Sequence, residues 1–185
     1  MELHERQTAI DRLKDNRERV LAAVSGLSRE QLTFRPAEER WSVADCLEHI
    51  NLVETRIFMG IQHALSLPAQ PEKRAEVAGK LEKLERAVPD RNHKVAGPPE
   101  VMPRREWSEF SEVVDEFERV RGRTLKFAGE TNCQLHDHFF PHFIFKDLDC
   151  YQWLIMMSLH ADRHIHQMEE VKTARAGAAP GSARV

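Results

Sequence analysis

The hydrophobic positions of the chain recur with the period of an α-helix in four long segments. Between about residues 3 and 25 they recur at spacings of three, four and seven, and they are Leu3, Ile10, Leu13, Val20, Leu21 and Val24. This spacing places them on one helical face, and Gly26 follows as a typical helix stop. We therefore predict a first helix here, with its apolar stripe facing a core.

A second helix is predicted from Trp41–Ser42 to about Leu67–Pro68, after a loop at residues 28–40. Ser42 is a suitable N-cap, and Asp45 three residues later completes a capping box with Asp in place of the usual Glu. The stripe that this helix buries is Val43, Cys46, Ile50, Val53 and Ile57.

Residues 69–105 are the longest connection and contain five of the nine prolines, with charged residues between them. A short helix is expected at about 73–87, and a loop elsewhere. Loops of this length are often functional. A long crossover also fits a bundle whose second and third helices are not joined by a tight turn.

A third helix is predicted over residues 104–128 and a fourth over about 148–173, with an irregular stretch at 129–147 between them. Asp149 is expected to cap the fourth helix. No segment alternates with the period of a strand for long enough to build a sheet. The prediction is a single all-α domain over residues 1–175, a four-helix bundle with a long crossover between helices 2 and 3. The small, polar tail at 176–185 is expected to be disordered.

The charge composition of the chain argues against some classes of binding partner. Lys and Arg number 27 against 30 Asp and Glu, a formal net charge of −3, which gives no electrostatic reason to expect nucleic acid or an anionic membrane. The N-terminus is charged and has no apolar core of a signal peptide, and no apolar run approaches the length of a membrane span. We expect a soluble cytoplasmic protein whose three cysteines are reduced thiols.

Histidine supplies the candidate chemistry. On the fourth helix, His160 and His164 fall within the apolar stripe, one turn apart, so both imidazoles point the same way and can share a metal ion. His49 lies in the buried sector of the second helix, whereas His166 falls on the exposed side of the fourth. One histidine on an apolar stripe is more often a hydrogen-bonded core residue. Three unpartnered imidazoles in one core would be costly, however, so together they predict a metal site with an open position.

Other candidates have simpler explanations. The run from His160 to His164 lacks the Glu of an H-E-x-x-H motif. Cys46 is interpreted as a small core residue, because a thiolate ligand would close the site. Glu48 points away from the stripe and Glu54 lies at its edge, so neither is a compelling base. The histidines at 136, 138 and 142 could form a second metal cluster, but a solvated loop is the favoured interpretation.

Three runs of sequence resemble the motifs of the DinB-like, or YfiT-like, superfamily of bacterial four-helix-bundle metal-binding proteins. They are Arg35-Pro36 with the segment Trp41–Ile50, the segment Asp149–Leu154, and the segment His160–Met168. The last contains the pattern His-x-x-Arg-His-x-x-Gln, and the resemblance extends over about residues 3–172. The family name does not imply the DNA polymerase of similar name.

The resemblance implies that His49, His160 and His164 bind one Zn²⁺ or Ni²⁺ per chain. It also makes Arg163 and Gln167 candidates for substrate binding; their structural alternatives are an ion pair and a hydrogen bond to another helix or to a ligand histidine. His142 is a further candidate, near the expected mouth of the pocket. The sequence identifies no catalytic residue.

Family members of known activity include thiol-dependent S-transferases that use bacillithiol or mycothiol. The implied function is transfer of a low-molecular-weight thiol cosubstrate to a small electrophilic substrate. The alternatives are a metal-dependent hydrolase and a non-catalytic metal-binding stress-response protein. Many relatives carry a His-Pro-x-x-Gly-like turn before the last helix, and residues 142–146 here lack its Pro and Gly. Substrate specificity therefore does not carry over.

The resemblance also implies a homodimer. Apolar residues of the third helix span more than one face, and four phenylalanines between residues 139 and 145 add apolar surface in a loop. Uncovered apolar surface of this kind is typical of an interface, and a twofold dimer is the commonest closed arrangement. The alternative is a monomer in which the 69–105 segment covers this surface.

Overall fold

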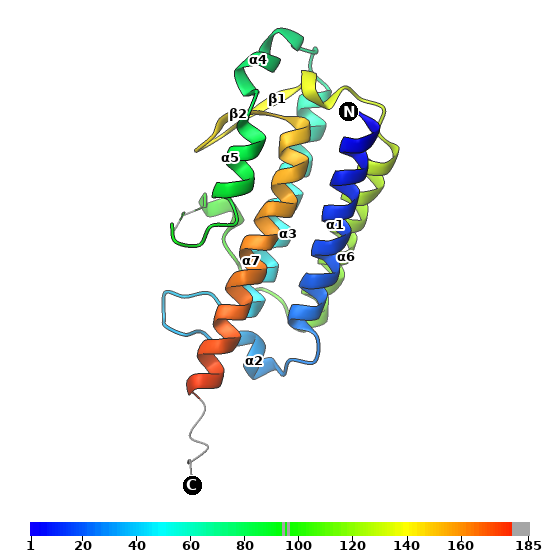
Figure 1. The fold of residues 1–185 in the computed structure, drawn as a ribbon. Helices are drawn as coiled ribbons and strands as arrows, with labels where there is room; N and C mark the ends of the chain where they lie inside the picture. The colour runs from blue at the N-terminus through cyan, green and yellow to red at the C-terminus, as the bar shows by residue number, and fades with distance from the viewer. Residues whose placement is uncertain (94, 96, 179–185) are drawn as a thin grey trace.

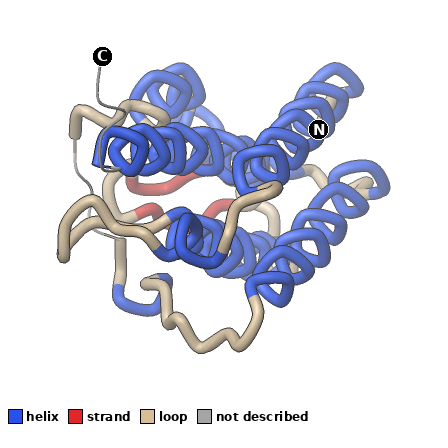
Figure 2. Tube along the Cα trace, turned by 90° about the horizontal axis from the view of Figure 1, so that it is seen from below, coloured by secondary structure: helices blue, strands red, loops and turns tan. Residues whose placement is uncertain are grey.

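The computed structural model describes residues 1–93, 95 and 97–178, and in them four long helices pack side by side (Figure 1). The long helices are α1 (Leu3–Val24), α3 (Val43–Leu65), α6 (Phe110–Glu130) and α7 (Cys150–Ala178). Both α1 and α3 pack against α6 and α7, so α1 and α3 lie diagonally across the bundle. The view along the bundle in Figure 2 shows the same arrangement. The predicted four-helix bundle is confirmed.

Contacts between the helices fix their directions. Arg6, near the start of α1, donates to the carbonyl oxygen of Ala128 near the end of α6, so these two helices are antiparallel. Asn51 near the start of α3 donates to the carbonyl oxygen of Val113 near the start of α6, so α3 and α6 run parallel. Parallel neighbours cannot be joined by a tight turn, which is why residues 66–109 cross the length of the bundle. This is the predicted crossover.

Local signals set most helix boundaries. The Ser42 hydroxyl accepts from the backbone N–H of Asp45 and the Asp45 carboxylate accepts from that of Ser42, which is the predicted capping box. The third helix begins at Phe110, so its predicted start at residue 104 is wrong. Arg105 has a φ of 64°, a left-handed conformation that cannot continue an α-helix, and a capping box at Glu109 starts the helix instead.

The connections contain more structure than predicted. In the expected loop at 28–40, Ser28 caps a short helix, α2 (Arg29–Thr33). The crossover holds four short elements where one helix was expected. They are η1 (Pro71–Lys73), α4 (Arg74–Val77), α5 (Lys80–Ala87) and η2 (Pro99–Val101). Gly79, at a φ of 73°, separates α4 from α5.

A small β-hairpin closes one end of the bundle (Figure 1), in a stretch predicted to be irregular. After η3 (Leu135–Asp137), strands β1 (Phe139–His142) and β2 (Lys146–Asp149) pair in antiparallel register. Phe140 stacks on Trp153 with ring centroids 4.3 Å apart, and the Trp153 Nε1–H donates to the Phe140 carbonyl oxygen. Gly60 allows this, because a Cβ there would lie 2.6 Å from the Phe140 ring.

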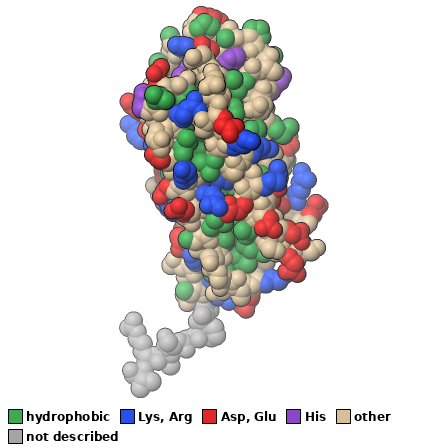
Figure 3. Space-filling model, turned by 90° about the vertical axis from the view of Figure 1, so that its right-hand side faces the viewer, with side chains coloured by type: hydrophobic (Ala, Val, Ile, Leu, Met, Phe, Trp, Pro, Cys, Tyr) green, Lys and Arg blue, Asp and Glu red, His purple; other side chains and the backbone are tan. Residues whose placement is uncertain are grey.

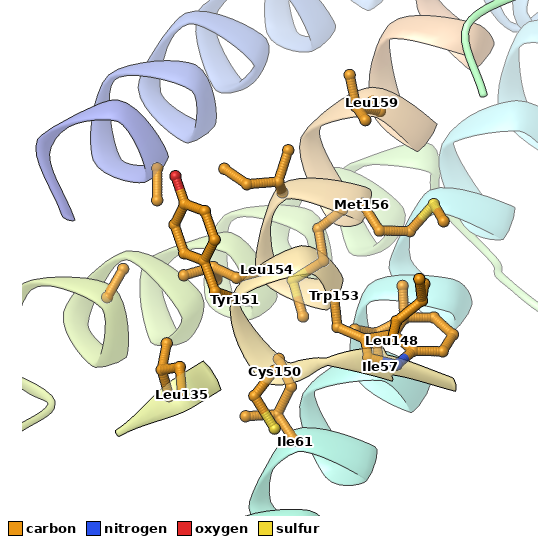
Figure 4. Packing of buried hydrophobic residues seen from close by; sticks show 14 of the residues in the cluster. Ile57, Ile61, Leu135, Leu148, Cys150, Tyr151, Trp153, Leu154, Met156 and Leu159 are labelled. Atoms are coloured by element: carbon orange, nitrogen blue, oxygen red, sulfur yellow. The ribbon is translucent and has the colours of Figure 1, made fainter. Parts of the chain in front are cut away.

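The apolar stripes meet in the core beneath the hairpin. Figure 4 shows Trp153 of α7 close to Ile57 of α3 and to Leu148 of β2, and Leu154 on the side of α7 where Tyr151 lies. These residues are buried. The hairpin therefore completes the core at the end where the four helices open. On the face shown in Figure 3, acidic and basic side chains are interspersed.

The last helix is longer than the sequence predicted. Helix α7 continues to Ala178, beyond the predicted end near residue 173 and into the segment expected to be disordered. The remainder of that expected tail, residues 179–185, lies outside the described residues. Among the described helices, none is long and apolar enough to cross a membrane.

A buried ion pair holds three of the helices together. Arg121 of α6 is fully buried and donates from Nε and Nη2 to the carboxylate of Glu54 on α3, at 2.8–3.1 Å. Its Nη1 donates to the carbonyl oxygen of Leu13 on α1 at 2.8 Å. Glu54 is thus buried and paired, not at the edge of the stripe as the sequence indicated. Satisfied buried charges fix the packing of the surrounding helices, and breaking one partner leaves the other uncompensated.

We predict that Arg121→Met lowers the free energy of unfolding by about 3–5 kcal/mol, because Glu54 then stays buried without a partner. The double substitution Glu54→Leu/Arg121→Met should recover a large part of that loss. Arg119→Met, which removes an exposed pair with Glu116 on the same helix, should leave stability almost unchanged, because solvent screens such a pair. Urea unfolding measures all three, and a double variant no more stable than Arg121→Met contradicts the assignment.

His136 joins α1 to the start of α7. Its Nδ1 lies 2.9 Å from the Asp149 carboxylate and its Nε2 lies 3.0 Å from that of Glu5. Asp149 also accepts from the backbone N–H of Gln152 at 2.7 Å, so it caps α7 as predicted. The hydrogen bond to Asp149 and then that to Glu5 raise the pKa of His136 above its ordinary 6.5, against the opposing effect of burial. The protonated imidazole therefore stabilises the fold.

The raised pKa of His136 gives a pH dependence with a defined sign. Its stabilising effect is complete below the unfolded-state pKa of 6.5 and disappears as the pH rises through the higher folded-state pKa. Wild type should therefore lose stability relative to His136→Gln across that interval. Urea unfolding of both proteins at successive pH values checks this, and a constant difference between them would contradict it.

Candidate metal centre

The structure brings His49, His160 and His164 together in the interior of the bundle. His49 lies near the start of α3, and the other two lie on successive turns of α7. The Nε2 atom of His160 is 3.2 Å from that of His49 and 3.1 Å from that of His164. One ligand atom from each of the three imidazoles lies within 4.8 Å of the others. This is the juxtaposition that the two apolar stripes predicted.

The opposite ring nitrogens have partners that fix the imidazole tautomers. The Nδ1 atom of His49 lies 2.6 Å from the carbonyl oxygen of Val101, which can only accept, so Nδ1 carries the proton. The Nδ1 atom of His164 lies 3.0 Å from Oε1 of Gln167 and donates to it in the same way. Both Nε2 atoms then present lone pairs toward His160. Such outer hydrogen bonds are typical of metal-binding histidines.

Burial keeps the three imidazoles neutral. It lowers the pKa of His49 to about 4, with a partial offset from the hydrogen bond to Val101. Burial and then the neighbouring imidazoles lower the pKa of His160 and His164 well below 6.5. Neutral imidazole is the form that binds a metal.

The donor set fits a divalent cation. With Nδ1 protonated on His49 and His164, their two Nε2 lone pairs converge on Nε2 of His160. That atom can donate one proton at most, so one lone pair would stay unsatisfied in a buried site. An ion between the three nitrogens satisfies all of them.

The side chains around the three histidines leave one side of this cluster accessible. Trp41 covers it from outside: its ring stacks on His164 at 5.7 Å between centroids and meets the edge of His49 at 4.6 Å. His49 and His164 are each 5% exposed, whereas His160 is only partly buried. An incoming molecule would therefore reach the three nitrogens from the side of His160.

The other acidic and thiol candidates are occupied elsewhere. Cys46 is fully buried, and burial raises the pKa of its thiol far above the ordinary value, so it stays protonated. The Glu48 carboxylate accepts from the backbone N–H groups of Arg104 and Arg105. Glu54 is held by Arg121 in the core. Within the described residues, the group of possible metal ligands contains the three histidines alone.

The three residues predicted to bind substrate have different surroundings. His142 ends β1, its Nδ1 accepts from the backbone N–H groups of Ile144 and Phe145, and burial lowers its pKa to about 4. Arg163 donates to carbonyl oxygens of the crossover, and these belong to Val88, Asp90 and His93. Gln167 orients His164. Gln167 thus positions an imidazole, which is its structural alternative from the sequence, whereas Arg163 anchors the crossover to α7 through backbone carbonyls and not through the expected ion pair.

The expectation that residues 136, 138 and 142 lie in a solvated loop is wrong. His136 bridges two carboxylates, and Nδ1 of His138 lies 3.0 Å from the carbonyl oxygen of Ala64. All three side chains are partly buried. The hydrogen bond between His49 and the carbonyl oxygen of Val101 could not be predicted from the sequence. The acceptor is a backbone carbonyl 52 positions away in the sequence. Because every residue has such a carbonyl, the residue type at position 101 does not indicate its role.

Comparisons with known proteins agree with this architecture. Residues 12–168 match the sequence profile of the DinB superfamily. The chain is 28% identical over 149 residues to the uncharacterised protein YuaE of Bacillus subtilis (strain 168), covering 80% of this chain and 88% of YuaE.

A solved structure shares the fold. YfiT from Bacillus subtilis, described as a probable metal-dependent hydrolase with an unusual four-helix bundle topology, superposes with a TM-score of 0.64 at 15% identity. The match covers 96% of this chain and 90% of YfiT. The family profile spans most of the sequence, and the bundle, its crossover and the three convergent histidines accord with it: this chain belongs to the DinB superfamily.

Proposed function

We propose that the chain binds one divalent metal ion, Zn²⁺ or Ni²⁺, through the Nε2 atoms of His49, His160 and His164. The observation that carries this proposal is the convergence of three neutral imidazoles, of which His49 and His164 have their outer nitrogens engaged by protein acceptors. Imidazole suits both metals, so the donor set does not distinguish them. Trp41 and the buried helix faces would exclude bulk water from all sides except that of His160.

The proposed reaction is transfer of a low-molecular-weight thiol to a small electrophilic substrate. A divalent ion held by three protein ligands supplies a Lewis acid that lowers the pKa of a thiol or a water. The chain's own contribution is to orient the reactants on the side of His160. A sulfur–carbon bond would form there as the bond between that carbon and its leaving group breaks, and the thiol proton and the leaving group would pass to solvent. His142, whose Nδ1 accepts two backbone hydrogen bonds, would keep its proton on Nε2 and could donate to a substrate.

Hydrolysis is the second candidate reaction, supported by the description of the structural neighbour YfiT as a probable metal-dependent hydrolase. The same three imidazoles and the same open side would serve it, with water in place of the thiol. The third alternative is a metal-binding stress-response protein without turnover.

Metal content tests the site directly. Purified wild type should contain about one Zn²⁺ or Ni²⁺ per chain by elemental analysis, and His160→Ala/His164→Ala should contain almost none. His166→Ala is the matched control, because this exposed histidine lies on the same helix. Gln167→Leu should weaken metal binding about 10–100-fold, because His164 loses its orienting acceptor. Equal metal content in wild type and the double variant would contradict the proposal.

Turnover distinguishes the three functions. The metal-loaded protein is incubated with low-molecular-weight thiols and monochlorobimane, and in parallel with a chromogenic ester. We expect formation of the thiol adduct to exceed the uncatalysed rate in wild type and His166→Ala, and to return to it in His160→Ala/His164→Ala. Ester cleavage with that pattern would favour the hydrolase instead. Adduct formation that is unchanged in the double variant would remove the transferase.

The homodimer stays a prediction. Phe143 and Ile144 at the tip of the hairpin are 60% and 47% exposed, which adds apolar surface at that end of the bundle. Light scattering on a size-exclusion column should give twice the chain mass of 21.4 kDa. A mass equal to that of one chain would establish a monomer.

A further inference from the structure

A second cavity lies between α3, α6 and the last part of the crossover. Its volume is about 500 Å³, within the range of small-molecule sites. Its apolar walls include Leu52 and Met59 of α3 and Val113 of α6. None of the three convergent histidines lines it, although Val101, whose carbonyl oxygen accepts from His49, does, so the cavity adjoins the candidate metal centre.

Two buried polar groups lining this cavity lack partners within the described part of the chain. Asn51 is 5% exposed; its Nδ2 donates to the Val113 carbonyl oxygen at 2.9 Å, and its Oδ1 has no hydrogen-bond partner there. Exchanging the amide oxygen and nitrogen would not help, because two acceptors would then face each other. The Nε1–H of Trp107 is likewise buried without an acceptor. Two residues that line the cavity therefore carry one unpaired acceptor and one unpaired donor, and leaving such groups unsatisfied is costly.

The lining is acidic. Five carboxylates and two guanidinium groups border the cavity, an excess of three acids. The five are Glu48, Glu100, Glu106, Glu112 and Glu116, and the two are Arg56 and Arg104. Glu106 is exposed and, among the described residues, makes no hydrogen bond or ion pair. Arg119, outside the lining, pairs with Glu116 and leaves an excess of two acids, and this charge balance favours a cationic ligand over an anionic one.

We propose that this cavity binds a small amine with an apolar body and a hydrogen-bond acceptor at its other end. The ammonium group donates to Asn51 Oδ1 and lies in the field of the carboxylates, Glu106 among them. The apolar body packs against Leu52 and Met59. The acceptor receives the Nε1–H of Trp107. Each orphaned atom then has a partner, and the chemistry requires no metal.

Three matched probes test the charge preference. All three compounds contain a phenol. At the other end tyramine carries a positive ammonium group, tyrosol a neutral hydroxyl group and 4-hydroxyphenylacetate a negative carboxylate. Each is titrated into the full chain by calorimetry after metal has been removed with a chelator, so that ligation at the histidines cannot contribute. The expected order of affinity is tyramine, then tyrosol, then 4-hydroxyphenylacetate. The indole N–H resonance of Trp107, assigned with Trp107→Phe, should shift on binding.

Two substitutions locate the ligand. Asn51→Leu should weaken tyramine binding about tenfold, because a hydrogen bond to a charged donor is lost. Glu106 lies on the exposed rim, so Glu106→Gln should leave the fold intact; it should weaken the binding of tyramine but not that of tyrosol. Glu38→Gln, an exposed residue outside the lining, is the control and should change neither. The proposal is overturned if tyramine does not bind, if 4-hydroxyphenylacetate binds as tightly, or if the Trp107 resonance does not move on saturation.

Discussion

The burial of three neutral imidazoles at one point of the core is the constraint on which the rest of this structure depends. An imidazole lone pair that faces another lone pair away from water is costly, and here two of them converge on a third ring. The chain supplies an acceptor for the outer nitrogen of His49 and of His164, and thereby leaves a lone pair on each of their inner nitrogens. Val101 and Gln167 are as much part of the arrangement as the ligands that they orient.

The convergence of the three histidines requires a particular arrangement of the helices. His49 comes from α3 and the other two imidazoles from α7, so these two helices must be neighbours. The long crossover lets α3 and α6 run parallel, and it also places Val101 against His49. Arg163 and Arg91 tie the crossover to α7 through hydrogen bonds and an ion pair. In the middle of α3 and α6, the Arg121–Glu54 pair sets the packing of these two helices on each other.

The sequence was informative wherever the signal was local or periodic. Helical spacing located the four long helices and placed His49, His160 and His164 on buried faces, and Ser42 with Asp45 fixed the start of α3. It was uninformative where the structure depends on distant partners. The acceptor for His49 is a backbone carbonyl, the partner of Glu54 lies on another helix, and the hairpin strands of four residues each are too short for a periodic signal. The start of α6 was misjudged because apolar Trp107 extended the pattern past the left-handed Arg105.

X-ray absorption at the edge of the metal that copurifies with the chain tests the central claim most directly. If three imidazoles hold the ion, the first shell should contain three nitrogens at about 2.0–2.1 Å with the outer-shell scattering typical of histidine rings, and a lighter ligand in the open position. Sulfur at about 2.3 Å in place of one of the three nitrogens would instead place a cysteine among the protein ligands. That result, or a shell with fewer than three imidazoles, would contradict the site described for His49, His160 and His164.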